Sequence, residues 1–281
     1  GGPPAGEAPE EAQVRAAAAR LRDRAAALAQ GFGAETPCCL GTGEVDVIVQ
    51  GSGFMVLYFL GVHQVLSRLP GVQVQRYAGA SSGAQAPFQL LLDGENAALE
   101  SYLAYAELSD RFPPTLGTLG CAYRCDSHWY EYGNDLIDRH TADLPCLANR
   151  MFVSVTRWGF PMQHVQISEF GDPVRAKEAF YATGTALTKC HGFWASDGGG
   201  STNRCPFFED RVRPQLVVQP IRAGFPLRMA ARYSFEEAVD AVTKGQDDMA
   251  AFLREPFDWT PPLGGKAPLG VLPATLAAFT S

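Results

Sequence analysis

The chain has 281 residues, of which 46% are hydrophobic and 19% charged, so it is long enough for one large α/β domain or two small ones. Its formal net charge of −7 argues against a nucleic-acid binder, which normally carries a basic face. The longest apolar stretch, FMVLYFLGVHQVL, is interrupted by Gly61 and His63 and is too short to span a membrane. We therefore expect a soluble or peripheral protein. The chain starts without methionine and shows no signal or transit peptide, which fits a processed mature protein, including an organellar one, and leaves the compartment open.

Seven cysteines raise the question of a metal site. Cys121 and Cys125 lie near His128, but this spacing is not a paired C-x-x-C set, and no second cluster completes four ligands. We therefore expect no metal and no cofactor, and we interpret the cysteines as reduced core residues, alone or with one disulfide. The remaining cysteines are Cys38, Cys39, Cys146, Cys190 and Cys205.

The first 44 residues are expected to form an N-terminal extension. Residues 1–11 are rich in Pro, Gly, Ala and Glu, which predicts an irregular lead-in. Residues 11–30 predict an Ala-rich helix that ends at the glycines of GFG. Because Ala buries little surface, packing on the domain or on a partner protein explains this helix better than a membrane surface does. Its thin apolar stripe consists of Val14, Ala18, Leu21, Ala25 and Leu28.

The domain proper, residues 45–256, begins with an alternation of strands and helices. Residues 45–49 predict an apolar strand, which the glycines of QGSGF end. A helix is expected from about residue 54 to 69, then a strand ending at Gly79, then a helix over 81–94. This βαβα order is typical of a parallel sheet with right-handed crossovers, and we expect a three-layer α/β/α fold with a mainly parallel central sheet.

The later elements are less regular. Helices are predicted over residues 99–112, 127–140, 172–184 and 233–256, and strands over 150–158, 164–170 and 215–221. Asp172 and Pro173 mark a helix start, and Ser234 with Glu237 has the spacing of a capping box. Residues 257–281 form a Pro/Gly-rich tail that we expect to be loop-like.

A G-x-S-x-G pattern surrounds Ser81, with Gly79 and Gly83 on either side. Alone it is weak, because a flexible loop also collects such residues. At a strand-to-helix turn, however, flanking glycines permit the cramped backbone that presents a nucleophilic serine. Gly51, Ser52 and Gly53 end the preceding strand. Since adjacent parallel strands end on the same side, the two turns should meet, and the second turn can offer backbone N–H groups to an oxyanion.

The base for such a serine is less obvious. In a Ser-acid-His order the histidine comes late, and the last histidine is His191, which would give a Ser81/Asp172/His191 triad of α/β-hydrolase type. Six residues after it, Asp197 opens the small-residue stretch SDGGGSTN. A carboxylate on such a turn can approach another loop and act as the base itself, or it can simply cap the turn.

These motifs resemble those of the patatin-like phospholipases, particularly the animal-type members. QGSGFMVLYFLGVHQVL is similar to that family's glycine-rich oxyanion segment, GASSGA to its serine elbow, and DGGGSTNRCP, with Asn203 and Pro206, to its aspartate motif. RMFVSVTRW is similar to a strand that lies between the two catalytic elements. The resemblance covers residues 45 to about 255, with the motifs in the family's order.

The resemblance implies a serine esterase of patatin type. Ser81 would be the nucleophile and Asp197 its base, with no histidine required, and Gly51, Ser52 and Gly53 would supply the oxyanion donors. The substrate would be an ester of a phospholipid, galactolipid or acylglycerol at a membrane or lipid surface. Three departures affect loop and pocket shape: Ser52 is the middle of the triplet, Phe54-Met55 follow it without a cation, and FYATGTALTKCHGF lacks a proline.

Some sequence features leave two interpretations open. Residues 211–232 hold five arginines and no acid, and these either face phospholipid headgroups or are scattered over a surface. Phe54, Met55, Phe207 and Phe208 form either an apolar entrance for acyl chains or part of the core. An alternative to the lipid acyl hydrolase is a patatin-fold subunit with a structural or lipid-binding role in a larger assembly, which the N-terminal helix would join to a protein partner.

Overall fold

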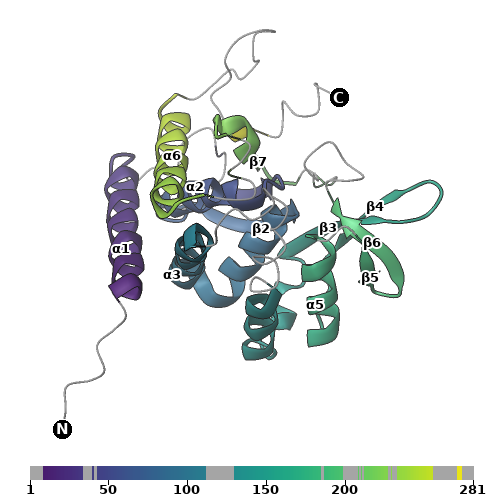
Figure 1. Ribbon diagram of the computed structural model, residues 1–281. Helices are drawn as coiled ribbons and strands as arrows, with labels where there is room; N and C mark the ends of the chain where they lie inside the picture. The colour runs from purple at the N-terminus through teal and green to yellow at the C-terminus, as the bar shows by residue number, and fades with distance from the viewer. Residues whose placement is uncertain are drawn as a thin grey trace.

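The computed structural model has an α/β fold with a mixed, mostly parallel central sheet flanked by helices, which is consistent with the predicted three-layer α/β/α architecture (Figure 1). The structure describes residues 9–33, 40, 43–111, 130–184, 187–198, 208, 210, 212–226, 229, 233–255 and 271–273. The predicted C-terminal tail falls mostly outside this set, as do five of the seven cysteines. Of the two that are described, Cys146 is exposed and Cys190 buried, and both thiols are free.

The sheet has a parallel half and an antiparallel half. Its strand order is β5-β6-β3-β2-β1-β7-β8, and β4 also pairs with β3. The parallel half consists of β1 (Glu44–Val49), β2 (Gln73–Ala80), β3 (Met151–Arg157) and β7 (Gln215–Val218). The antiparallel half consists of β4 (Gln163–Ile167), β5 (Thr188–Cys190) and β6 (Phe193–Asp197). A further antiparallel strand, β8 (Val271–Pro273), comes from the predicted tail and pairs with β7 at the opposite edge of the sheet.

The predicted βαβα unit is present from β1 onward. A short 3-10 turn η2 (Gly53–Val56) leads into α2 (Leu57–Leu66), then β2, then α3 (Ser82–Arg111). The helices predicted over 81–94 and 99–112 are both present within α3, and a kink separates them at Gly94, whose φ of 82° and ψ of 170° are not helical. The first two crossovers of the parallel sheet therefore follow the sequence expectation closely.

The remaining helices begin where their caps predict. The Asp172 carboxylate accepts the Arg175 N–H at the start of α5 (Pro173–Ala182). Ser234 and Glu237 form a reciprocal capping box at the start of α6 (Phe235–Arg254). Residues 130–139 are helical, and two 3-10 turns, η3 (Leu144–Leu147) and η5 (Pro220–Ala223), complete the described elements.

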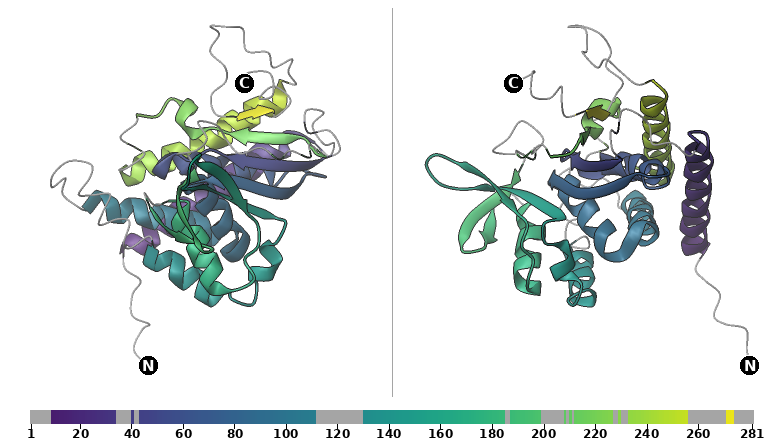
Figure 2. Two further views of the ribbon diagram at one scale, coloured as in Figure 1. Left: turned by 90° about the vertical axis from the view of Figure 1, so that its right-hand side faces the viewer. Right: turned by 180° about the vertical axis from the view of Figure 1, so that it is seen from behind.

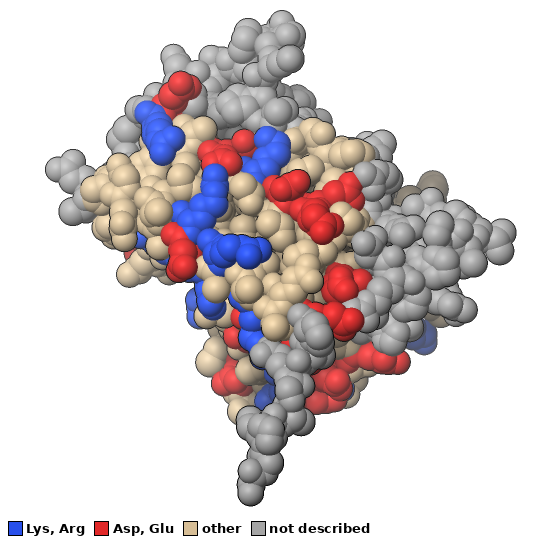
Figure 3. Space-filling model, turned by 60° about the vertical axis from the view of Figure 1, so that its left-hand side comes forward, with Lys and Arg blue, Asp and Glu red and all other residues tan. Residues whose placement is uncertain are grey.

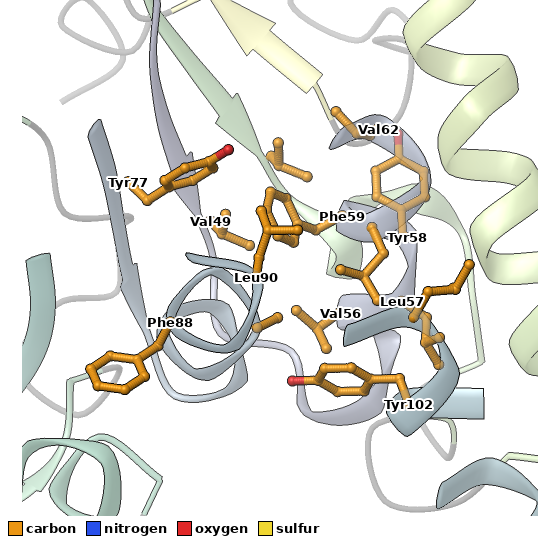
Figure 4. Packing of buried hydrophobic residues seen from close by; sticks show 14 of the residues in the cluster. Val49, Val56, Leu57, Tyr58, Phe59, Val62, Tyr77, Phe88, Leu90 and Tyr102 are labelled. Atoms are coloured by element: carbon orange, nitrogen blue, oxygen red, sulfur yellow. The ribbon is translucent and has the colours of Figure 1, made fainter. Parts of the chain in front are cut away.

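The core lies mainly on the face of the sheet that α2 and α3 cover (Figure 4). Side chains alternate along β1, so Val47 and Val49 join this large cluster while Ile48 points to the opposite face. The opposite face has a small described cluster, in which Ile48 packs with Ala78, Phe208 and Val217. The parallel strands are thus covered on both faces, as near-continuous apolar strands require.

Helix α1 (Pro9–Gln30) packs against α2, α3 and α6 and buries its small apolar stripe there. The Arg24 guanidinium donates to the Gln246 side chain at 2.9 Å and pairs with Asp247. The helix therefore packs on the domain, which is one of its two expected surfaces. Figure 3 shows this side of the molecule, over which basic and acidic side chains lie interspersed.

Candidate active site

Ser81 forms the turn between β2 and α3. Its φ is 56°, a left-handed conformation that is uncommon for a residue other than glycine and that clusters at functional sites. Residues 77–80 and 82–90 are all buried, whereas Ser81 is partly exposed. The turn therefore presents one serine to the surroundings from an otherwise buried strand and helix.

The glycines on either side of Ser81 are required by close backbone contacts. A Cβ on Gly79 would lie 2.0 Å from the Gly83 carbonyl oxygen, and a Cβ on Gly83 would lie 2.4 Å from the Val49 carbonyl oxygen. Both distances are far below what a real side chain tolerates, and both involve backbone atoms that cannot move aside. The G-x-S-x-G pattern is thus part of a tightly packed turn and not a flexible loop.

The two glycine turns meet, as the parallel order predicts. A Cβ on Gly51 would lie 2.8 Å from both the Ala80 carbonyl oxygen and the Ser81 Cβ. The turn continues through Gly53, whose φ is 56°. Gly51, Ser52 and Gly53 therefore lie directly against the serine turn, at the carboxyl edge of the parallel strands, which is the usual place for a site in an α/β sheet.

The backbone donors near Ser81 come from two helix starts. The Ser52 N–H donates to the Ser82 Oγ at 3.2 Å, so this predicted oxyanion donor is engaged within the protein. Helix α3 begins at Ser82, directly after the serine, which places the positive end of a long helix at the site. The start of α3 therefore favours negative charge next to Ser81, whereas the Ser52 N–H would first have to leave the Ser82 Oγ.

A hydroxyl relay holds the serine turn against β3. The Ser81 N–H donates to the Thr183 Oγ1 at 2.8 Å, and that hydroxyl donates to the Ser154 carbonyl oxygen at 2.9 Å. Thr183 is fully buried at the carboxyl end of α5. Thr183 was not predicted from the sequence, because a threonine in YATG carries no signal apart from its position after a predicted helix.

Unsatisfied polar atoms gather at the same edge. Among the described residues, the buried Gln50 Oε1, Ser52 Oγ and Ser154 Oγ have no hydrogen-bond partner. Gln50 and Ser52 adjoin Gly51, and Ser154 pairs with Ala80, the residue before Ser81. Buried polar atoms without partners are rare in a packed core, and in a native structure they require an explanation such as a functional role.

Asp197 lies level with Ser81 on the same side of β3. Val153 and Ser154 each pair with β2 and with β4, whereas Val155 pairs with β4 and with β6, so β6 follows β2 along one edge of β3 and β4 occupies the other edge. Along that shared edge Ala80 pairs with Ser154, and Asp197 pairs with Val155, the next residue of β3. The Asp197 carbonyl oxygen accepts the Thr156 hydroxyl at 2.8 Å, which fixes the end of β6. The structure therefore brings both predicted catalytic residues to the same level of one sheet edge.

The alternative Ser81/Asp172/His191 triad is not assembled. His191 lies in the turn between β5 and β6, where its N–H donates to Glu178 and its Nε2 lies 3.2 Å from the Arg175 carbonyl oxygen. This turn is at the opposite end of β6 from Asp197. Asp172 caps the amino end of α5, whereas the carboxyl end of that helix contacts Ser81. Ten helical residues, about 15 Å, separate those ends.

The predicted apolar entrance is only partly a surface feature. Met55 is buried in the core, and the Phe208 ring packs under the Arg76 guanidinium, 4.0 Å away, on the other face of the sheet. The Phe54 ring is half-buried between the rings of Tyr105 and Tyr233. Of these phenylalanines and Met55, Phe54 therefore remains the candidate for the site's apolar wall, while Phe207 lies outside the described residues.

The arginine-rich segment is described only in part. The Arg213 guanidinium pairs with Glu44 at 3.0 Å and lies 3.9 Å from Asp46. Glu44 and Asp46 lie in the amino-terminal half of β1, so Arg213 is far from the serine turn at the carboxyl end of the strands. Outside the described residues lie the side chains of the other four arginines, Arg211, Arg222, Arg228 and Arg232. The same holds for the remaining residues of the aspartate motif and the cysteine cluster, namely Asn203, Pro206, Cys121, Cys125 and His128.

Comparison with protein-family models found no match, and neither did comparison with curated proteins. Within the described ranges, no group of His, Cys, Asp or Glu side chains has an arrangement suited to a metal ion. In the same part of the chain, no helix is both long and apolar enough to cross a bilayer.

Proposed function

We propose that the protein is a serine lipid acyl hydrolase of patatin type, with Ser81 as nucleophile and Asp197 as its base. The observation that carries this proposal is the conformation of Ser81: a left-handed residue at a strand-to-helix turn, partly exposed between buried neighbours. Such a turn is the usual way in which an α/β fold presents a nucleophilic serine. The resemblance of the three motifs to patatin-like phospholipases supplies the substrate class, an ester of a phospholipid, galactolipid or acylglycerol.

In the proposed reaction Ser81 Oγ attacks the ester carbonyl while the Asp197 carboxylate accepts the hydroxyl proton. The tetrahedral oxyanion is stabilised by backbone N–H groups of Gly51, Ser52 and Gly53 and by the positive end of α3. Collapse of the intermediate releases the alcohol, which takes up the proton from Asp197. Water then attacks the acyl-serine, Asp197 accepts a proton from that water, and the fatty acid leaves as the Ser81 hydroxyl is restored.

The level positions of Ser81 and Asp197 support this dyad. Along one edge of β3, Ala80 pairs with Ser154 and Asp197 pairs with Val155, so no strand separates Ser81 from Asp197. Thr183 and Thr156 hold the two backbones through their hydroxyl groups. No histidine is needed for proton transfer in this arrangement.

The test is hydrolysis of a short-chain soluble ester and of a phospholipid by the wild type and three variants. We expect Ser81→Ala and Asp197→Asn to lose at least about a hundredfold in turnover, because removal of the nucleophile or base eliminates the chemical step. His191→Ala is the matched control and should remain largely active. An inactive His191→Ala, with an active Asp197→Asn, would contradict the dyad and favour a histidine-dependent mechanism.

A second candidate function is a patatin-fold subunit that binds lipid or a protein partner with little catalysis. The engagement of the Ser52 N–H by the Ser82 Oγ favours it, since this donor would have to exchange partners before it could bind an oxyanion. A stable stoichiometric partner in the native extract, together with no turnover on any lipid ester by folded wild type, would support this function over the hydrolase.

A further inference from the structure

The two antiparallel hairpins of the sheet carry most of the exposed large hydrophobic side chains. Among the described residues, five of the eight such side chains lie there, and four of them form a cluster that we name the aromatic tip. Phe160 is fully exposed, and the other members of the tip are between 50% and 55% exposed. Soluble surfaces rarely gather such residues without a function. The aromatic tip consists of Trp158, Phe160, Met162 and Trp194.

Hydrogen bonds join the two hairpins at this tip. The Trp158 N–H donates to the Trp194 carbonyl oxygen at 2.8 Å, so the turn after β3 continues the pairing with β6. The Trp158 indole N–H donates to the Ser196 Oγ at 2.9 Å, which leaves the ring exposed with its polar group satisfied. The tip is therefore an ordered surface, with contributions from both hairpins.

The aromatic tip projects past the edge that carries Ser81. Ser154 pairs with Ala80, and β3 then continues through Arg157 before the turn at residues 158–162. Four residues at about 3.3 Å each place the start of this turn roughly 13 Å beyond the level of Ala80. Figures 1 and 2 show the two hairpins standing out from the body of the molecule, on the side away from α1.

The charge around the tip differs in sign from that of the whole chain. The chain has a net charge of −7, but residues 150–168 and 187–196 contain arginine, lysine and histidine and no acidic residue. The Arg157 guanidinium lies 5.3 Å from the centre of the Phe193 ring, and the Lys189 ammonium lies 5.5 Å from that of Trp194. Cations held beside exposed aromatic rings match an anionic lipid surface.

We propose that the aromatic tip inserts into the interfacial region of a phospholipid bilayer that contains anionic lipid, and that this contact turns the Ser81 edge of the sheet toward the membrane. Trp prefers the headgroup level of a bilayer, while Phe and Met bury apolar surface among the acyl chains. The orientation of Ser81 toward a lipid substrate rests on the proposed function, whereas the membrane contact itself does not.

The test is binding of the full chain to vesicles of phosphatidylcholine with a minor fraction of phosphatidylserine, measured by sedimentation. The variant Phe160→Ser/Met162→Ser should bind at least about tenfold more weakly, because it lacks the two apolar side chains that the bilayer would bury. Val212→Ser is the matched control, since Val212 is also exposed, at 69%, but precedes β7 on the far side of the sheet from the tip. Equal binding by the wild type and the double variant would overturn the proposal.

Two further measurements identify the lipid source and separate this proposal from the hydrolase. Arg157→Ala and Lys189→Ala should each weaken binding about fivefold on vesicles with phosphatidylserine and leave binding to pure phosphatidylcholine unchanged. Ser81→Ala should bind vesicles as the wild type does. Binding that needs the tip, without hydrolysis by the wild type, would refute the hydrolase alone.

Hydrolysis of a soluble ester without any vesicle binding would refute the tip alone. Two of the four tryptophans are in the tip, so a blue shift of the emission on vesicle addition is expected. Self-association of the wild type that the double variant loses, in the absence of vesicle binding, would assign the tip to a second copy of this chain and overturn the proposal.

Discussion

The parallel and antiparallel halves of the sheet differ in how their residues are used. In the parallel half, β1, β7 and the carboxyl half of β2 are almost wholly buried, and the turns after β1 and β2 pack glycine against backbone. In the antiparallel half, β4 and β5 are largely solvent-accessible, and the turns carry aromatic side chains in water. The comparison indicates that the parallel half fixes the backbone of the Ser81 turn, whereas the antiparallel half contributes Asp197 at the end of β6 and extends the aromatic tip into solvent.

The largest expected effect is at the serine elbow. Gly83→Ala should lower the free energy of unfolding by more than about 3 kcal/mol, because the new methyl group would meet the Val49 carbonyl oxygen and the backbone of Gln50. Gly159→Ala in the antiparallel half should change it by less than about 1 kcal/mol, since the only atom that the new Cβ would approach is 3.7 Å away. Urea denaturation measures the change in the free energy of unfolding for each variant, and equal changes would contradict the predicted difference between the two halves.

The buried His63 of α2 should make the free energy of unfolding depend on pH. Burial lowers the pKa of His63 to about 4, with the Glu95 carboxylate opposing and Arg68 adding to this shift. In the unfolded chain His63 therefore binds a proton near pH 6.5, whereas in the folded protein it binds that proton only near pH 4. The resulting stability, about 3 kcal/mol, should be fully present above pH 6.5 and lost as the pH falls toward 4.

Denaturation curves between pH 7 and 4 test this expectation. His63→Gln should flatten most of the pH dependence. Burial also lowers the pKa of His164 in β4, so His164→Gln is the comparison variant and should remove a smaller part of the slope. The hydrogen bond between Tyr77 OH and His63 Nδ1, 3.0 Å long, places the titrating group against β2. A slope that persists in His63→Gln would show that another group is responsible.

A smaller effect is expected at the relay beneath Ser81. Thr183→Val should lower the free energy of unfolding by about 1–3 kcal/mol, because it leaves the Ser81 N–H and the Ser154 carbonyl oxygen without their shared partner. It should also slow any reaction of Ser81 by displacing the turn. Thr183→Ser keeps the hydroxyl and should restore most of both properties. Loss of stability with an unchanged reaction rate would limit Thr183 to a structural role.

The smallest effect is expected at the aromatic tip. Phe160→Ala should change the free energy of unfolding by less than about 0.5 kcal/mol, since the ring is fully exposed. Its counterpart Phe88→Ala in α3 should cost about 3–5 kcal/mol, because that ring is fully buried (Figure 4). Thermal or urea denaturation of the two variants compares the halves directly, and a costly Phe160→Ala would mean that the tip is part of the core.

The parallel half was largely predictable from sequence because its signals are local. Apolar runs end at glycines at residues 49–53 and 79–83, and Asp172, Ser234 and Glu237 carry cap chemistry that depends on near neighbours alone. The meeting of the two glycine turns followed from the parallel order. The cramped backbone at Ser81 was expected because glycines flank the serine at a strand-to-helix turn.

The antiparallel half was predictable only in part, because strand β4 was predicted over 164–170 whereas β5 and β6 were not. The three-residue strand β5 and the strand β6 exist because they pair with each other and with β3, and such pairing is non-local. Asp197 was expected on a turn, whereas it is the last residue of β6. The hydrogen bonds through Thr183 and the exposure of Trp158 and Trp194 also depend on tertiary contacts, so no sequence pattern predicts them.

The most direct test of the account is labelling of the folded protein with a fluorescent fluorophosphonate, which reacts with an activated serine. We predict that the wild type is labelled, that Ser81→Ala is not, and that Asp197→Asn is labelled much more slowly while His191→Ala keeps the wild-type rate. A folded wild type that resists labelling in the presence of lipid vesicles, or labelling that persists in Ser81→Ala, would contradict the claim that Ser81 is the nucleophile.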